Sequence, residues 1–273
     1  GILDNNVMWA TNARFLNDSK ELAHGVERAT QALDAYDHSG LQPATVRFLK
    51  GLSDPHRKVL SGFLDRTLDV YVSCFCPSGD LLSQWRAYGG QGSAGGYAIG
   101  IRTPGDVFAW PQSAPGGHAF SLRRVLYDRD EQDRELEEFI ALLVPILDAD
   151  PNDLVRQNAF GRFFADGVVE AATWCKHSSF EEEQEWRVIY IRTVDPEPLP
   201  LEHRPSRGYL VPYVKLHLPK AVGAFHDYLP IANVNCGPSA EPELKARGVR
   251  SMLSDLPQYR DVVVDGSAAP LRW

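Results

Sequence analysis

Cysteine, methionine and long apolar runs are scarce in this sequence. Only 4 of its 273 residues are Cys and 2 are Met, and the cysteines stand in apolar or strand-like contexts. This usage is typical of buried, free thiols in a reducing compartment rather than of a disulfide framework. No apolar run approaches the roughly 20 residues that a membrane-spanning helix needs, and no secretion signal opens the chain. We therefore expect a cytoplasmic protein without a membrane partner.

Positive charge is also in short supply. The chain has 28 Lys and Arg against 36 Asp and Glu, which gives a net charge of −8 at pH 7. This balance disfavours an extended phosphate-binding surface, although it leaves room for a local basic groove. The hydrophobic fraction of 44% is ordinary for a globular protein and predicts a sizeable core. The length exceeds a typical domain of about 100–150 residues, and we expect one larger domain over residues 1–273.

Three kinds of functional motif are missing. The pairs Cys74-x-Cys76 and Cys175-x-His177 lack the spacing of a zinc knuckle, so no metal is expected. No Ser, His and Asp follow the order of a catalytic triad, and there is no nucleophile elbow. The glycine-rich stretch 89–96 lacks the Lys and Ser/Thr of a phosphate-binding loop. A triad hydrolase and a nucleoside triphosphate site are therefore disfavoured.

Hydrophobic periodicity predicts an α+β fold. Helical spacing dominates about 21–68 and 130–175, which we interpret as helical insertions. Pro212 suggests an edge strand or a bulge, and residues 195–205 are interpreted as a proline-rich connection. Without regular βαβ alternation, a mixed or antiparallel twisted sheet with surrounding helices is expected. Its strands should cover residues 7–11, 70–76, 96–101, 122–127, 188–191, 209–218, 231–235 and 262–264.

Three further patterns concern the helices. Asp18, followed by Glu21, should cap the first long helix as in a capping box. Phe160, Phe163, Phe164 and Val168 recur at helical spacing and should form a core stripe. The charged run 130–138 should be a solvated helix face.

The stretch 180–191 is the strongest functional candidate. Four of its first six residues are acidic, and it continues into the strand pattern Val-Ile-Tyr-Ile of residues 188–191. On an extended backbone, Glu183 and Glu185 share one face. A partly desolvated carboxylate fixed at a strand entrance can accept a proton or bind a substrate hydroxyl. The alternative is a solvated acidic run whose partners are Lys176, Arg187 or Arg192.

A second candidate lies around the glycine-rich stretch. Strand, short helix, glycine loop and strand follow one another over residues 70–101 and form a plausible pocket wall. Five glycines in the eight residues 89–96 permit close approach of the backbone to a ligand; the alternative is a flexible hairpin connection. Arg86 can bind a phosphate or carboxylate bidentately, or can pair with Asp80. The polar candidates around the loop are Ser73, Ser83, Arg86 and Tyr88.

Several short motifs occur in one order along nearly the whole chain. They are Phe15-Leu16-Asn17-Asp18-x-x-Glu21, Ser73-Cys74-Phe75, Leu82-Ser83-Gln84-Trp85-Arg86-x-Tyr88-Gly89, Gly96-Tyr97-Ala98-Ile99-Gly100, Lys176-x-x-x-Phe180-x-x-Glu183-Gln184-Glu185-Trp186-Arg187 and Ser267-x-x-Pro270-Leu271-Arg272. Each motif alone is unspecific. Their combination resembles the bacterial family known as domain of unknown function 2971.

The layout of these motifs is also similar to the ADP-ribosyltransferase superfamily, above all its nucleic-acid-modifying branch. That similarity implies an ADP-ribosyltransferase-like fold and an NAD-consuming ADP-ribosyltransferase or NAD glycohydrolase, acting as a toxin or antiphage effector. Glu185 would be the catalytic glutamate that stabilises an oxocarbenium-like state, and Glu183 its companion that orients the acceptor. Ser73 or Tyr97 would supply the central motif, and Arg86 and Tyr88 would join them in binding NAD. The acceptor would be a protein or a nucleic acid.

The chain departs from the family pattern at its beginning. Family members usually begin with a strand that holds a His-Tyr pair, upstream of the equivalent of Ile2-Leu3, and the present sequence starts after that point. The expected nicotinamide-anchoring residue is thus missing, through truncation or through loss of NAD binding. The second hypothesis is therefore a non-catalytic ligand- or partner-binding regulatory module on the same scaffold. A third, a hydrolase with Mg²⁺ on the acidic run, is disfavoured because such ions draw ligands from several segments.

Overall fold

The structure, a computed structural model, describes residues 2–5, 7–16, 20–54, 69–89, 95–102, 120–192, 197–206, 208–216 and 228–270. The chain divides into two compact units. The helical unit comprises Trp9–Cys74 and Gln112–Lys215, and the small unit comprises Gly1–Met8, Phe75–Pro111 and Leu216–Trp273. That residues 1–273 fold as one domain stays a prediction.

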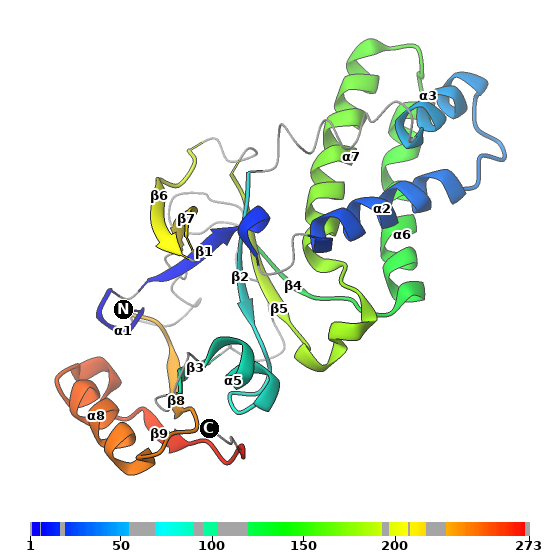
Figure 1. Ribbon diagram of the computed structural model, residues 1–273. Coiled ribbons are helices and arrows are strands. Elements are labelled where there is room, and N and C mark those ends of the chain that lie inside the picture. Colours follow the sequence, from blue (N-terminus) through cyan, green and yellow to red (C-terminus); the bar gives the residue numbers. More distant parts are fainter. Residues whose placement is uncertain are drawn as a thin grey trace. The chain divides into compact units, whose positions relative to one another are not determined.

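The helical unit is built on a six-stranded sheet with the order β4-β5-β2-β1-β7-β6 (Figure 1). Its printed strand pairs are antiparallel, with Phe120 opposite Tyr190 and Thr11 opposite Val72. The predicted α+β class with an antiparallel sheet is therefore confirmed. The strands are β1 (Met8–Asn12), β2 (Val70–Phe75), β4 (Phe120–Arg124), β5 (Trp186–Ile191), β6 (Leu201–Ser206) and β7 (Tyr209–Leu216).

Two strand predictions were wrong, and both errors concern the β6 edge of this sheet. Residues 201–206, expected in a proline-rich connection, form β6, whose burial alternates from residue to residue. Pro205 is tolerated there because an edge strand has one side without ladder partners. Since β6 takes the edge, β7 with its Pro212 lies inside the sheet, between β1 and β6.

The described residues of the helical unit also form four α-helices, which lie in the two predicted helical insertions. They are α2 (Lys20–Ala35), α3 (Pro43–Ser53), α6 (Arg129–Asp148) and α7 (Leu154–Trp174). Asp128 and Asp153 begin the two long helices by accepting hydrogen bonds from the backbone N–H groups of Glu131 and Val155. The predicted cap Asp18 lies outside the described residues.

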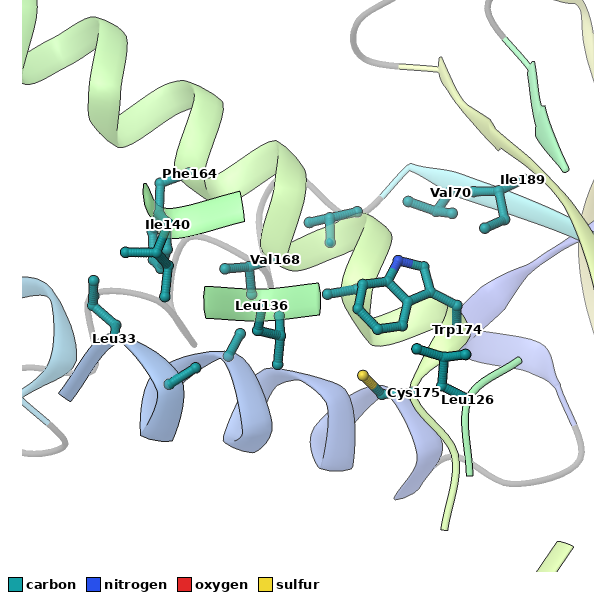
Figure 2. Close-up of a cluster of buried hydrophobic side chains, with 14 of the residues drawn as sticks. Leu33, Val70, Leu126, Leu136, Ile140, Phe164, Val168, Trp174, Cys175 and Ile189 are labelled. Atoms are coloured by element: carbon teal, nitrogen blue, oxygen red, sulfur yellow. The ribbon is translucent and has the colours of Figure 1, made fainter. Parts of the chain in front are cut away.

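The core of the helical unit lies between the sheet and these helices. Figure 2 shows Val70 of β2 and Ile189 of β5 facing Trp174 of α7, with Leu136 of α6 and Val168 of α7 beyond them. The predicted stripe on α7 is confirmed for its three members spaced four residues apart, which are buried: Phe160, Phe164 and Val168. It is wrong for Phe163, which is 60% exposed. A residue directly before a buried position is turned by about 100° around the helix and so leaves the core face.

The small unit contains a three-stranded sheet with the order β3-β8-β9. Strand β3 (Tyr97–Ile101) pairs antiparallel with β8 (Ile231–Cys236), which pairs parallel with β9 (Val263–Gly266). Helix α8 (Pro242–Ser254) buries Ala246, Val249 and Leu253 and packs on β8 and β9. The described part of the small unit also contains the short helices α1 (Ile2–Asn5) and α5 (Leu82–Tyr88). Across the described part of both units, no helix has the length and apolarity to cross a membrane.

Candidate active site

The acidic stretch forms a short 3₁₀ helix before it enters strand β5. The 3₁₀ helix η2 covers Ser178–Glu183, and Gln184 follows it in the left-handed conformation with φ 44° and ψ 45°. Glu185 comes next, and β5 begins at Trp186. The premise that Glu183 and Glu185 share one face of an extended backbone is therefore wrong. Their carboxylates still approach each other, because the turn at Gln184 directs both toward one cation.

That cation is Lys176, which lies at the centre of a four-residue ion network. Its Nζ is 2.7 Å from Oε2 of Glu183 and 3.3 Å from Oε2 of Glu185. Arg187 donates to the same Glu185 Oε2 through Nη2 and, at 3.0 Å, through Nε. Glu185 is 7% exposed, and both cations are buried more deeply. The alternative partners expected from the sequence are thus confirmed for Lys176 and Arg187, while Arg192 pairs with Asp69.

Backbone hydrogen bonds fix this network from several sides. The N–H of Glu185 donates to the Tyr127 hydroxyl at 2.9 Å, and its carbonyl accepts from the N–H of Val125 at 2.9 Å. Arg187 Nη1 donates to the Thr173 carbonyl at 2.7 Å. Burial raises the pKa of Tyr127 above its usual value, so the hydroxyl stays protonated at neutral pH. Glu185 therefore has a rigid backbone and one rigid carboxylate oxygen.

The two oxygens of Glu185 have different surroundings. All three contacts from Lys176 and Arg187 reach Oε2. Within the described part of the chain, no group donates a hydrogen bond to Oε1. Among the described residues, two buried cations face two carboxylates, so their charges balance. Chemically, Glu185 is held by one oxygen and can accept a hydrogen bond from an added hydroxyl at the other.

The remaining predicted site residues are distributed over both units. Ser73 is half-buried on β2 and belongs to the helical unit, as Glu183 and Glu185 do. Arg86, Tyr88 and Tyr97 belong to the small unit, and all three are exposed. The structure brings Glu183 and Glu185 together. Among the described residues, Ser73 forms no hydrogen bond with either of them.

Protein atoms fill the space beside the described glycines of the predicted loop. A Cβ on Gly95, whose φ is +51°, would lie 2.2 Å from the Pro238 carbonyl oxygen. Lys245 of α8 donates to the Gly96 carbonyl at 2.7 Å, and its Nζ lies 4.6 Å from the centre of the Tyr97 ring. These glycines therefore serve close packing against α8 and the turn before it. Residues 90–94 of the loop lie outside the described residues.

Asp80 joins two of the motifs that carry the resemblance. It accepts hydrogen bonds from Trp85 Nε1 at 2.7 Å, from the N–H of Ala268 at 2.8 Å and from the Ser267 hydroxyl. The predicted Arg86–Asp80 pairing is replaced by these three neutral donors. The motif around Trp85 and the motif that begins at Ser267 thus meet at one carboxylate, although they are far apart in the sequence.

Asp80→Asn is expected to lower the free energy of unfolding by about 1–3 kcal/mol at neutral pH, because a neutral amide is a weaker acceptor for three donors. Burial raises the pKa of Asp80, but the hydrogen bonds from Ser267, Trp85 and Ala268 outweigh burial and hold it below the usual 3.8. A carboxylate with a lowered folded-state pKa contributes stability that is present above the unfolded pKa and is lost as the pH falls.

The difference in the free energy of unfolding between wild type and Asp80→Asn should therefore have its largest value above pH 3.8. It should shrink as the pH falls through the lowered pKa of Asp80. Urea unfolding at stepped pH values measures it. A difference that stays constant down to the lowest pH at which the protein folds would show that the charge of Asp80 is not what stabilises the motif.

Residues 84–188 match a known family, described as Protein of unknown function (DUF2971). The DUF2971 match begins in α5, includes α6 and α7, and ends in β5, so it contains Glu183 and Glu185. Ser73 and the motif at Ser267 lie outside it. No curated protein and no solved structure matches the chain. The resemblance is thus supported for the central part of the chain.

The structure also bears on the predictions about the cysteines. Cys175 and Cys236 are buried, whereas Cys74 is exposed, so the expectation of uniformly buried thiols is wrong. In the described residues no cluster of His, Cys, Asp and Glu could hold a metal ion.

Two residues of the ion network were not identified correctly from the sequence. Tyr127 was missed, since a single tyrosine 58 residues before Glu185 gives no local signal of the contact. Lys176 was considered only as a charge partner, not as the centre of the network.

Proposed function

We propose that this chain is an NAD-consuming ADP-ribosyltransferase or NAD glycohydrolase and acts as a toxin or antiphage effector. The observation that carries the proposal is Glu185, a buried carboxylate at the start of β5. Its Oε2 is held by Lys176 and Arg187, and its Oε1 has no donor among the described residues. A carboxylate fixed in this way needs no reorganisation when it meets developing positive charge.

The proposed reaction breaks the bond between the nicotinamide nitrogen and C1′ of the attached ribose. The electron pair of that bond leaves with nicotinamide, and the ribose develops oxocarbenium character. Glu185 Oε1 would accept a hydrogen bond from a ribose hydroxyl and oppose the positive charge. Water or a nucleophile of a protein or nucleic acid then forms the new bond to C1′ and loses a proton. Glu183, the more exposed carboxylate of the network, would orient that nucleophile.

Glu185→Gln is expected to reduce nicotinamide release about 100-fold, because a neutral amide does not oppose the positive charge of the transition state. Glu183→Gln should reduce it less, by about 10-fold, if this residue acts on the acceptor. Glu182→Gln is the matched control: Glu182 lies in the same acidic run but is exposed, and its substitution should leave the rate unchanged. Nicotinamide is measured by chromatography, and transfer is followed with labelled NAD.

Thermal unfolding of each variant separates chemistry from folding. Glu185→Gln removes one charge from a buried, neutral network, so the assay is run below the melting temperature of the least stable variant. If the wild-type chain releases no nicotinamide and labels no protein, DNA or RNA, the enzymatic proposal fails. Equal rates for wild type and Glu185→Gln would remove Glu185 from the mechanism.

The second candidate function is a non-catalytic ligand- or partner-binding regulatory module. The observation that favours it is the charge balance of the network: Lys176 and Arg187 neutralise the two glutamates. A neutralised carboxylate opposes positive charge less strongly than an unpaired one. In that case NAD would not be consumed, and Glu185→Gln would change stability without any change in an activity.

A further inference from the structure

The C-terminal half of α6 is apolar on every side. Residues 139–147 read Phe-Ile-Ala-Leu-Leu-Val-Pro-Ile-Leu without a polar residue. A helix that is hydrophobic all round is normally buried all round. Here Ile140, Val144 and Leu147 are buried, whereas Leu142 on the opposite side is 74% exposed and Ile146 is exposed one turn later. This half of α6 therefore has a second apolar side that the described residues of the helical unit leave uncovered.

Helix α7 extends this apolar side. The two helices lie side by side (Figure 1), with the Phe139 and Phe164 rings stacked at 6.2 Å. Val155 and Phe163, two turns apart on α7, are 75% and 60% exposed. Four large apolar side chains thus gather on the outer side of one helix pair, and we call Leu142, Ile146, Val155 and Phe163 the outer face. Contiguous apolar surface of this kind marks an interaction site more often than scattered exposed residues do.

Charges on the same helices show what could cover the outer face. Arg156 Nη1 donates to the Ile146 carbonyl at 3.1 Å, so its guanidinium lies level with Ile146, one turn beyond Leu142. Its side chain is exposed, and its only ion pair with a described residue is a solvent-screened contact of 3.6 Å between Nε and Oδ2 of Asp153. Glu138 lies one turn before Leu142, is exposed and forms no ion pair with another described residue. The two opposite charges therefore flank Leu142 at similar distances along the helix pair.

A two-fold axis at Leu142 would bring these charges together. In an antiparallel pair of copies, a group one turn after Leu142 in one copy lies opposite a group one turn before Leu142 in the other. Arg156 of each copy would therefore face Glu138 of the other. Leu142 and Phe163 would pack on their counterparts near the axis. Helix α6 ends at Asp148, so two antiparallel copies centred on Leu142 overlap over residues 136–148, or about 20 Å of helix. With α7 beside it the shared surface covers on the order of 400 Å² per copy, about half of the roughly 800 Å² of a standard interface, so the dimer should be a weak one.

We propose that the outer face binds a second copy of this chain in a two-fold antiparallel dimer. The inference is independent of the proposed function, because it uses no residue of the ion network around Glu185. A membrane fits the observations less well. Glu131, Glu135 and Glu138 lie on the same side of α6 as Leu142, and the net charge is −8, whereas anionic lipid surfaces attract basic faces.

Sedimentation equilibrium of the whole chain tests the dimer. Wild type should reach twice the mass of the single chain as the concentration rises, and Leu142→Glu or Phe163→Glu should weaken dimerisation about 100-fold. Arg156→Glu and Glu138→Arg should each weaken it about 10-fold, and the double variant should return to within about threefold of wild type. Leu244→Glu is the control, since Leu244 is an equally exposed leucine on α8 of the small unit.

Circular dichroism melting of each variant shows whether it folds. A wild-type chain that stays monomeric at all concentrations overturns the proposal. So does a dimer that Leu142→Glu leaves intact, or a charge exchange that fails to restore association. Binding of the wild-type chain to vesicles of phosphatidylcholine and phosphatidylserine, lost in Leu142→Glu, would assign the outer face to a membrane and would also overturn it.

Discussion

Arg187→Met is expected to lower the free energy of unfolding by about 3–5 kcal/mol, because it leaves a buried carboxylate with too little positive charge beside it. Arg187 is 2% exposed, donates to Glu185 through two nitrogens and holds the Thr173 carbonyl through a third. Methionine fills similar volume but satisfies neither acceptor. Urea unfolding monitored by tryptophan fluorescence measures the loss.

The control for this prediction is Arg123→Met. Arg123 also pairs with glutamates, Glu135 and Glu170, but its side chain is 47% exposed. Water screens such pairs, so the expected loss is below about 1 kcal/mol. If both variants lose the same stability, the ion network around Glu185 is not a buried structural element. The double variant Arg187→Met with Glu185→Gln should lose less than the sum of the single losses, because the two side chains interact directly.

Gly25→Ala is expected to destabilise the protein by about 3 kcal/mol, opposite in sign to its effect on an isolated helix. In a free helix, alanine in place of glycine stabilises by about 0.5–1 kcal/mol. Here α2 crosses α7 so closely that a Cβ on Gly25 would lie 2.3 Å from Cα of Ala172 and 3.0 Å from its backbone nitrogen. Backbone atoms cannot rotate away, so α2 must move off α7 and give up core contacts.

Gly161→Ala is the matched control for Gly25→Ala. Gly161 also lies inside a helix, α7, but a Cβ at this position meets no atom within 4 Å. It should therefore show the ordinary stabilisation of about 0.5–1 kcal/mol. Thermal and urea unfolding of both variants measure whether each substitution raises or lowers the free energy of unfolding. A stabilised Gly25→Ala protein would mean that α2 and α7 are not in close contact.

Much of the fold could be predicted from the sequence because its signals are local. The apolar spacing of 160, 164 and 168 predicted a buried side of α7, and the run 188–191 predicted a strand. The same local signals failed at Phe163 and at Pro212. Phe163 is exposed although it directly precedes the buried Phe164. The position of a strand within a sheet depends on which other segment forms the edge.

The candidate site was likewise predictable only where its signals are local in the sequence. The sequence singled out Glu183 and Glu185, since acidic residues directly before a strand are visible without tertiary information. Their geometry could not be predicted, because the left-handed turn at Gln184 and the approach of Lys176 depend on how α7 meets β5. Tyr127 and Thr173 contact the network from segments that give no local sign of it.

By itself, the sequence determined the class of fold, the two helical insertions and the two glutamates worth testing, because periodicity and motif spacing are properties of neighbouring residues. Only the tertiary structure decided which cations hold Glu185, which side of α6 stays uncovered and which of two helical glycines is indispensable. Lys176 and Arg187 are near Glu185 in the sequence, but their approach depends on the turn at Gln184 and on how α7 meets β5. The other two outcomes depend on distances between segments that lie tens to hundreds of residues apart along the chain, as does the contact of Asp80 with Ser267. No local pattern encodes such distances.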